Sequence, residues 1–301
     1  MKFAKLRKSV GKIIFGAAVI AAMSLLFIDY WVDLRQLFIG GRGADMLSVY
    51  FLNVGQGDGI YIRTPGGQDI VIDGGPDARI VAALGKVMPF WDTEIDVLLL
   101  THPHADHVAG LVDILKRYKV DAVYYTGVNY SSGVYSEFLN LIKEKNIPLR
   151  AVIAGDHIPL FGAGEFDVLW PKESLDGRKV DDLNNSSIVA RLVFGYTSFL
   201  FAGDAEEKVE KKLLAGGKSL DVDLLKLGHH GSKTASSQEF LKAITPEYAV
   251  ISCGKNNNFG FPHLLVLRRL ARLGVEIFRT DLNGTVVART DGKTLKLEKA
   301  R

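Results

Sequence analysis

Three histidines lie within six residues of this chain, in the segment THPHADHVAG at positions 101–110. They directly follow an apolar run, IDVLLL (95–100), which has the composition of a buried β-strand. The loop after the carboxyl end of a strand is where α/β sheets place their functional groups. Imidazoles together with a carboxylate, here Asp106, are a ligand set that suits Zn²⁺, Mn²⁺ or Fe²⁺. The segment therefore predicts a metal centre at the edge of a sheet.

From Leu47 onward the sequence alternates short β-rich runs with helical stretches. We predict strands at 48–54, 59–63, 69–73, 95–100, 121–125 and 150–153, with helices at 78–88, 106–118 and 134–145. The second half repeats this rhythm, with strands near 165–170, 187–194, 197–203, 222–227, 248–252, 275–279, 284–290 and 294–298, and helices at 205–214, 236–243 and 263–272. This order is typical of one α/β domain, over 47–301, in which two sheets pack face to face with helices outside.

The N-terminal segment 1–32 is predicted to be a basic stretch followed by a transmembrane helix. Sixteen uncharged residues, Ile13–Ile28, follow a cluster of lysines and arginines, and Tyr30 and Trp31 stand where aromatic side chains anchor a span. The alternative is a signal peptide that is cleaved. Both interpretations put the body of the protein on the extracytoplasmic side, because the positive end stays inside. We therefore expect a single-pass protein of the cell membrane, or a secreted one, with 33–46 as a linker.

Composition and charge narrow the range of functions. Cys253 is the single cysteine, which excludes a disulfide framework and a Cys-rich zinc module. Of the 37 basic residues, five lie in the first twelve positions, so that the rest of the chain has slightly fewer basic than acidic side chains. The body thus carries no overall basic signal for nucleic acid.

Six stretches of the chain, in this order, resemble the metallo-β-lactamase superfamily, and within it the hydrolase domain of ComEC-type competence proteins, which take up DNA. They are FLNVGQGDGIYI (51–62), VIDGG (71–75), THPHADHVAG (101–110), LNNSSIVARL (183–192), FLFAGDAE (199–206) and LLKLGHHGSK (224–233). The resemblance runs from about Ser48 to the end. It implies an α/β fold, a four-layer αββα sandwich with two divalent metal ions, Zn or Mn, at one edge of the sheets.

The resemblance implies a role for each ligand-bearing motif. His102 and His104 would bind the first metal, Asp106 and His107 the second, and Asp204 would bridge the two. For Asp204 the residues alone leave a second interpretation open, an N-cap for a helix that starts at Ala205.

The motif HHGS offers one further ligand. His230 is favoured over His229, because the superfamily often has His-x-Ser at this point and His230-Gly231-Ser232 fits that spacing. His229 would then contact the phosphate of a substrate or lie behind the ligands, and we assign it to catalysis together with Asp106.

Other residues are expected behind the ligands or against the substrate. Asp73 would orient the metal-binding loop, whereas Asp58 is either a turn residue or a substrate contact. Asn184 and Asn185 stand where many superfamily members have a third histidine for the first metal. Amide oxygens are weak ligands for zinc, so the first site should be looser and favour Mn²⁺.

A second departure from the subfamily lies in the sequence FGFPHLLVL. Phe261 stands where a histidine is expected, and His263, two places later, is the candidate replacement. The resemblance implies a metal-dependent hydrolase, and most directly a phosphodiesterase or nuclease that acts on DNA during uptake. Candidate phosphate contacts are Arg268, Arg269, Arg272, Lys226 and Lys233.

Two other functions stay open. One is a cell-envelope phosphodiesterase or a lactonase-type ester hydrolase of the same fold, which a body without excess positive charge favours. The other is a tethered binding module with a weakened metal site. In the first function, a separate channel protein would be the partner that conducts the DNA, because one predicted span cannot.

Overall fold

The computed structural model describes residues 46–161, 164–217 and 219–300. The predicted membrane segment, 1–32, and all of the predicted linker except residue 46 lie outside this part of the chain. No helix within the described ranges is long and apolar enough to cross a membrane.

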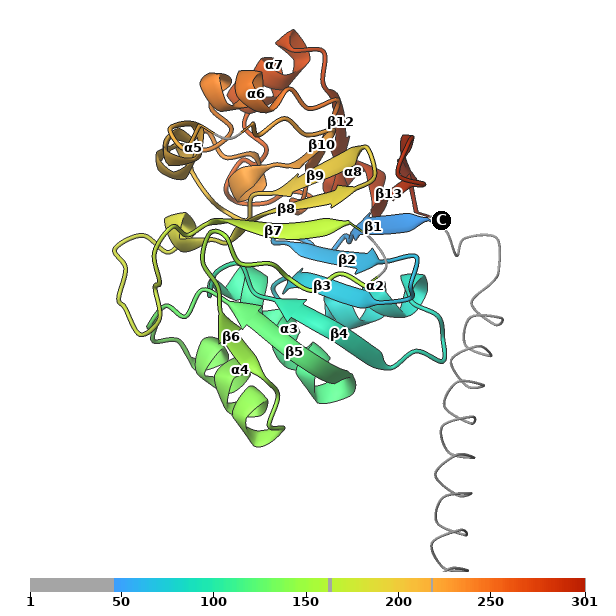
Figure 1. Cartoon of the computed structure of the whole chain (residues 1–301), viewed down its shortest axis with the longest axis vertical. Coiled ribbons are helices and arrows are strands. Elements are labelled where there is room, and N and C mark those ends of the chain that lie inside the picture. Colours follow the sequence, from blue (N-terminus) through green and yellow to red (C-terminus); the bar gives the residue numbers. More distant parts are fainter. Residues whose placement is uncertain (1–45, 162–163, 218, 301) are drawn as a thin grey trace, which may run out of the picture. The chain divides into compact units, whose positions relative to one another are not determined.

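The first sheet has eight strands in the order β14-β13-β1-β2-β3-β4-β5-β6 (Figure 1). Its strands are β1 (Leu47–Phe51), β2 (Gly59–Arg63), β3 (Asp69–Gly74), β4 (Glu94–Leu99), β5 (Lys119–Tyr125), β6 (Leu149–Ala151), β13 (Val286–Thr290) and β14 (Leu295–Lys299). Neighbours from β14 to β3 are antiparallel, and those from β3 to β6 are parallel.

The second sheet has six strands in the order β12-β11-β10-β9-β8-β7. They are β7 (Glu165–Trp170), β8 (Val189–Phe194), β9 (Thr197–Phe201), β10 (Leu224–Lys226), β11 (Tyr248–Ile251) and β12 (Glu276–Arg279). Here β7, β8 and β9 are antiparallel, and β9 to β12 are parallel. Each half of the chain thus contributes an antiparallel part followed by a parallel part, which explains the repeated rhythm of the sequence.

Apolar side chains from both sheets form the central layer of the core. Alternate residues of β1 are buried, and the ring of Phe51 lies 6.4 Å from that of Phe201 on β9. The same buried cluster includes Ile62 and Leu192, one from each sheet. Because neither sheet can leave such a face in water, the two sheets pack against each other.

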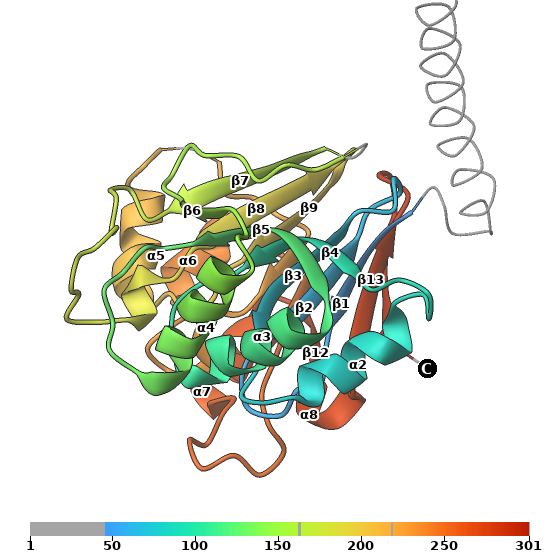
Figure 2. The ribbon, with the colours of Figure 1, turned by 90° about the horizontal axis from the view of Figure 1, so that it is seen from below.

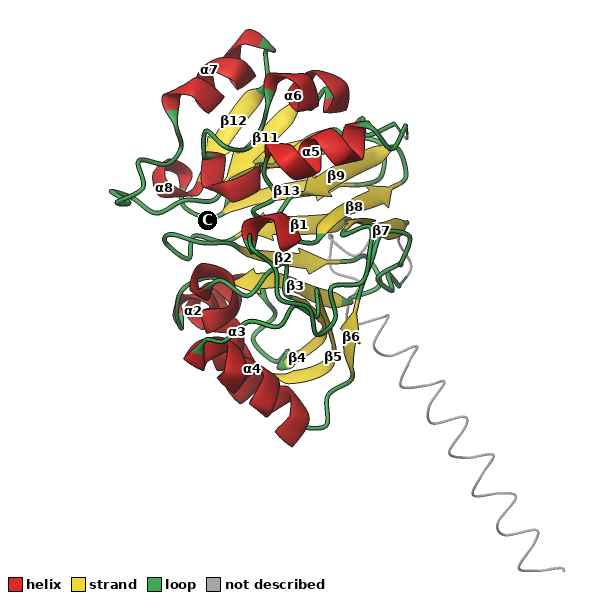
Figure 3. Cartoon of the chain, turned by 90° about the vertical axis from the view of Figure 1, so that its left-hand side faces the viewer, coloured by secondary structure: helices red, strands yellow, loops and turns green. Residues whose placement is uncertain are grey.

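Helices cover the two outer faces (Figures 2 and 3). A cluster on the outer face of the first sheet joins it to α2 (Arg79–Val87), α3 (Ala105–Arg117) and α4 (Gly133–Glu144). A third cluster joins the second sheet to α5 (Glu207–Leu214), α6 (Gln238–Ile244) and α7 (Leu264–Arg272). The predicted αββα order of layers is therefore confirmed for the described part of the chain.

The predicted elements agree with the observed ones to within a few residues. Three short elements have no counterpart in the prediction: the 3₁₀ turns η1 (Asn184–Ser186) and η2 (Gly228–Gly231), and the helix α8 (Thr280–Asn283). Each has at most four residues, too few for a hydrophobic period to show in the sequence. Two of them, η1 and η2, hold residues of the candidate site.

Close packing of α3 on β3 depends on glycine. A Cβ on Gly110 would lie 2.0 Å from the carbonyl oxygen of Gly74 and 2.8 Å from that of Asp77. Both neighbours are backbone atoms, which cannot swing aside as a side chain can. The start of α3, with its predicted ligands, is held against the end of β3 by this contact.

Gly110→Ala should therefore lower the free energy of unfolding by about 1–3 kcal/mol through overpacking. Gly85→Ala is the matched control, because Gly85 is also inside a helix but nothing lies within 4 Å of an added Cβ. That variant should instead raise the free energy by about 0.5–1 kcal/mol. Urea unfolding of both variants tests the difference, and a Gly110→Ala protein as stable as the wild type would contradict it.

Candidate metal centre

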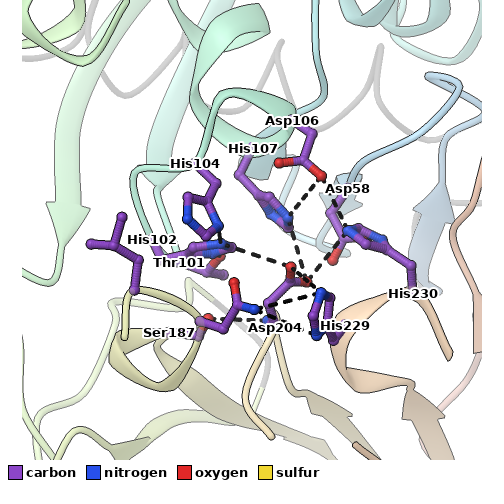
Figure 4. A network of polar contacts seen from close by, with 12 residues as sticks. Asp58, Thr101, His102, His104, Asp106, His107, Ser187, Asp204, His229 and His230 are labelled. Carbon is purple, nitrogen blue, oxygen red and sulfur yellow. Dashed lines mark hydrogen bonds and ion pairs between the residues drawn. The ribbon is translucent and has the colours of Figure 1, made fainter. Parts of the chain in front are cut away.

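The parallel strands of both sheets end at one edge, and the predicted site residues follow these ends. After β4 the chain runs extended through His102 and His104, and α3 then begins at Ala105. Nε2 of His102 and Nδ1 of His104 lie 2.9 Å apart. Asp106 and His107 come from the first turn of α3 and face the same space (Figure 4).

The second half of the chain supplies two more groups to this space. Asp204 follows β9, and its backbone N–H donates to Oγ of Ser187. His230 lies in η2, directly after β10. Oδ1 of Asp204 is 3.4 Å from Nε2 of His107 and 3.5 Å from Nε2 of His230. The predicted ligands from positions more than a hundred residues apart thus lie together (Figure 4).

The distances among these atoms fit a divalent cation. Oδ2 of Asp106 lies 3.4 Å from Nε2 of His230 and 3.9 Å from Nε2 of His107. Ligands at 2.0–2.1 Å from a tetrahedral zinc ion are separated by about 3.3 Å. Three of the atoms, Nε2 of His107, Nε2 of His230 and Oδ1 of Asp204, are buried without a hydrogen-bond partner. Buried polar atoms are rarely left without a partner. Asp106, His107 and His230 form one group of side chains that could hold a metal.

A second group of atoms lies beside the first. It consists of His102, His107 and Asp204, with 3.8 Å between Nε2 of His102 and Oδ2 of Asp204, and His104 adjoins it through His102. The two oxygens of Asp204 thus face different sets of imidazoles, as the predicted bridging role requires. The alternative role of Asp204 as an N-cap is wrong, since α5 begins at Glu207 with Glu206 as its N-cap residue.

The electrostatics of the cluster favour positive charge. Burial alone would raise the pKa of Asp204, yet His230 and His107 hold it well below its usual range. Burial alone would lower the pKa of His107, but the carboxylates of Asp204, Asp73 and Asp106 raise it well above its usual range. By contrast, burial lowers the pKa of His102, which is thereby kept neutral and able to act as a ligand.

The outer nitrogens of His107 and His230 have partners that fix the two rings. Nδ1 of His107 lies 2.8 Å from Oδ2 of Asp73, the role predicted for this acid, and Thr101 donates to the same carboxylate. Nδ1 of His230 lies 2.9 Å from the carbonyl oxygen of Ser252. Such contacts select the tautomer whose other nitrogen, Nε2, has its lone pair toward the cluster.

The backbone of η2 is strained where it presents the two histidines. His229 and His230 have φ values of 47° and 53°, a region that costs residues other than glycine about 1–3 kcal/mol each. Asp73 has a φ of 57°. The polar contacts of the cluster hold these conformations, which orient the side chains toward it.

His229 and His230 play different parts in the geometry. His230 is fully buried among the ligand atoms, whereas the side chain of His229 is 21% exposed. Nδ1 of His229 lies 2.9 Å from Oε1 of Glu206, and its Nε2 lies 4.0 Å from Oδ2 of Asp204. His229 therefore borders the cluster from the solvent side, beside His102 and His104 rather than His107.

Asn184 and Asn185 also differ in their contacts. Asn184 lies 3.5 Å from the ring nitrogens of His229, and its Oδ1 is buried without a partner. Asn185 instead accepts from the backbone N–H of Glu206 and donates to Asp182. Only Asn184 thus lies at the place of the missing third histidine, while Asn185 holds Glu206.

The structure shows the surroundings of Asp58, which has two predicted roles. Its carboxylate is buried and lies 2.7 Å from Nζ of Lys226 and 3.3 Å from Nδ1 of His230. Burial opposes ionisation, but Lys226 and His230 lower the pKa of Asp58 to about 2. Asp58 therefore lies buried beside His230, with which it also belongs to a group of side chains that could hold a metal. The motif GQGDG brings it there through Gly57 (φ 129°), where a Cβ would lie 2.2 Å from the carbonyl oxygen of Asp106.

One of the predicted phosphate contacts, Lys226, is corrected. Lys226 is fully buried and bound to Asp58, so it is not available to DNA. Arg269 donates to the carbonyl oxygen of Ser236. Arg268, Arg272 and Lys233 are exposed.

His263 does not take the place of the histidine expected at position 261. It is the exposed N-cap residue of α7, and its backbone N–H donates to the carbonyl oxygen of Gly231. The ring of Phe261 lies beside the cluster instead, 5.4 Å from the ring of His229.

Sequence reasoning missed the parts of Glu206, Lys226 and Ser252. Glu206 is two residues after Asp204, and its carboxylate accepts from Thr234 besides contacting His229. Because Glu206 is so close in sequence to a predicted ligand, its role beside the site could have been inferred from the local motif. Lys226 and Asp58 are 168 residues apart, and no local pattern predicts such a pair.

Comparisons with known proteins agree with this geometry. The family described as the Metallo-beta-lactamase superfamily matches residues 52–255, and the chain belongs to this superfamily. Together with the ligand cluster, this makes it a metal-dependent hydrolase of that fold.

The curated relatives include one named as a competence protein and one named as a recombination protein. The chain is 30% identical to ComE operon protein 3 of Bacillus subtilis, over 79% of this chain and 32% of that protein. It is 31% identical to Recombination protein 2 of Haemophilus influenzae, over 83% of this chain and 30% of that protein. The chain thus spans about a third of the length of these relatives. The resemblance to ComEC-type proteins predicted from the six motifs is confirmed.

Solved structures show the same fold. The metallo-beta-lactamase fold protein YhfI of Bacillus subtilis matches with a TM-score of 0.57 at 13% identity, over 82% of this chain and 100% of that chain. CmlA of Streptomyces venezuelae, a diiron beta-hydroxylase, matches with a TM-score of 0.51 at 16% identity, over 84% of this chain and 54% of that chain. At such identities the likeness concerns the fold alone.

Removing the buried cation Lys226 tests the support behind His230. Lys226→Met should lower the free energy of unfolding by about 3–5 kcal/mol, because it leaves the carboxylate of Asp58 buried without its partner. Urea unfolding at neutral pH with EDTA present measures this effect without a contribution from metal binding. The double variant Asp58→Asn/Lys226→Met should be more stable than Lys226→Met, since no unpaired charge remains. The pairing would be contradicted if the loss of stability in the double variant equalled the sum of the losses in Asp58→Asn and Lys226→Met.

Proposed function

We propose that the chain is a phosphodiesterase that cleaves DNA and works in DNA uptake. The observation that carries the proposal is the largely buried cluster of imidazoles and carboxylates that could hold a metal, in a chain whose relatives include one named as a competence protein and one named as a recombination protein. The ligands suit two divalent ions, Zn or Mn, and an amide, that of Asn184, in place of a third histidine favours Mn²⁺ at the first site.

In this proposal the chain's residues divide the work. His102 and His104 would hold one ion, Asp106, His107 and His230 the other, and Asp204 both. When bound, the ions would lower the pKa of a water molecule and neutralise charge that develops on phosphoryl oxygens.

His229 is the residue to which we assign proton transfer or a contact with the scissile phosphate. Its Nδ1 is held by the carboxylate of Glu206, which leaves Nε2 directed toward Asp204 and the solvent-facing side of the cluster. A neutral histidine fixed in this way, with its proton on Nδ1, can accept a proton at Nε2, and the imidazolium so formed can then donate that proton to a leaving oxygen. Asp106, 32% exposed, is the ligand nearest to solvent on the other side.

The setting of the domain completes the proposal. Residues 1–32 would anchor the protein in the cell membrane, or be cleaved as a signal peptide, with the hydrolase domain on the extracytoplasmic side. A separate channel protein would conduct the DNA strand across the membrane. This part is supported by the basic and apolar pattern of the sequence.

Substitution of the ligands tests the proposal directly. His102→Ala and Asp204→Ala should each lower the rate of DNA cleavage by at least about 100-fold, since even the groups that only orient metal ligands cost 10–100-fold. His157→Ala is the control, because His157 is 74% exposed and contacts Asp167 away from the cluster. Cleavage with Mn²⁺ or Zn²⁺ and its loss in EDTA are measured in parallel. Equal cleavage by all four proteins would remove the proposal.

A second candidate function is a hydrolase of cell-envelope phosphodiesters or of esters such as lactones. A cavity of about 450 Å³ lies next to η1, and its lining includes Asn185 and Ser186 but none of the six proposed ligands. The charged side chains that line this cavity are balanced: Lys172, Lys208 and Lys212 with Glu173, Asp181 and Asp182. Mixed charge suits a small or weakly charged substrate better than a polyanion.

The salt dependence of substrate affinity separates the two functions. Binding of single-stranded DNA should weaken steeply with salt, with a slope of log K against log salt of about −0.7 for each phosphate neutralised. A small ester would give a nearly flat response. A flat response for DNA itself, measured by anisotropy between low and high salt, would favour the second candidate.

A further inference from the structure

The segment that follows β11 forms a loop, GKNNNFGFPH (254–263), beside the metal centre. At its start the backbone N–H of Gly254 donates to Oε1 of Gln56. At its end the backbone N–H of His263 donates to the carbonyl oxygen of Gly231, in the motif of the two site histidines. The loop is thus fastened at both ends to segments that position Asp58, His229 and His230.

Asn257 gives the loop a fixed shape. Its Nδ2 donates to the carbonyl oxygens of Gly254 and Phe261, at 2.9 and 2.7 Å. Its Oδ1 accepts from the backbone N–H groups of Phe259 and Phe261, at 3.2 and 3.0 Å. One side chain therefore holds the backbone of both phenylalanines.

The two aromatic rings continue outward from the ligand cluster. The ring of Phe261 lies 5.4 Å from that of His229 and 6.2 Å from that of His230. The ring of Phe259 stacks on Phe261, with 5.5 Å between centroids and 14° between planes. Phe259 is 64% exposed, so this flat ring lies in water although its neighbours are fixed.

An exposed ring that stacks on a second ring beside the ligand cluster offers a surface for a ligand with a flat apolar face. Exposed cations accompany the rings: Lys255 belongs to the same loop, and Lys233 follows the motif of the two histidines. Flat rings with adjacent cations are the combination that binds unpaired nucleobases and the backbone beside them. Bases in a duplex already stack on one another and do not offer their faces.

We propose that Phe259 and Phe261 form a stacking platform for an unpaired base next to the scissile phosphate, which makes the site selective for single-stranded DNA. The inference rests on the proposed function and adds the substrate form and the residues that select it. Asn257 is a positioning residue that holds the platform in place.

Binding of two fluorescent phosphorothioate single strands, equal in length and charge, tests the platform. One carries adenine throughout, and the other is abasic. Fluorescence anisotropy with the full chain should show that Phe259→Ala binds the adenine strand about 5- to 150-fold more weakly, the range for loss of stacking on one base. The abasic strand should bind wild type and variant alike. Phe259→Trp should restore binding, and Asn257→Ala should weaken it.

Tyr196→Ala is the control, because Tyr196 is 86% exposed in the turn between β8 and β9, at the opposite end of the strands from Asp204. It should bind both strands as the wild type does. The platform would be overturned if the wild type bound the adenine and abasic strands with equal affinity, or if Phe259→Ala lost affinity for both strands equally. Cleavage of ordinary DNA is measured alongside. Cleavage without base-dependent binding would refute only the platform, and base-dependent binding without cleavage only the nuclease.

Discussion

The attraction between the carboxylate of Asp204 and the imidazoles around it joins the two halves of the molecule. Asp204 and His230 come from the second half, whereas His102 and His107 come from the first, and the atoms that face one another are buried. Negative charge enclosed in this way is costly unless a positive charge compensates it. The arrangement of the ligands, the tautomers of the histidines and the proposed hydrolysis all follow from the need for this compensating positive charge.

The surrounding structure keeps these groups in place. Asp73 holds His107, and the carbonyl oxygen of Ser252 holds His230. The left-handed backbone of η2 would relax in a free peptide, and it persists because Nδ1 of each ring is held, that of His229 by Glu206 and that of His230 by the carbonyl oxygen of Ser252. The buried pair of Asp58 and Lys226 adds a charge-balanced layer behind His230. A site supported from behind in this way costs little reorganisation when a charged substrate arrives.

Much of this could be predicted from the sequence, because the relevant signals are local. The apolar strand before THPHADHVAG and the turn after SFLFAG placed the ligands at strand ends, and parallel strands bring such ends to one edge. The contacts of Lys226 could not be predicted, since its partner is far away in the chain, and its charge suggested a surface contact that the fold excludes. Likewise, the sequence indicated only that Phe261 replaces an expected histidine. Only the loop geometry shows what its ring contacts.

The central claim is that this cluster binds a pair of cations that share Asp204. Anomalous X-ray diffraction from crystals grown with Mn²⁺ or Zn²⁺, collected on both sides of the metal absorption edge, tests it most directly. The account predicts two peaks that share the carboxylate of Asp204, one beside His107 and His230 and the other beside His102 and His104. Crystals in which the metal scatters elsewhere, while these side chains keep the positions described above, would contradict it.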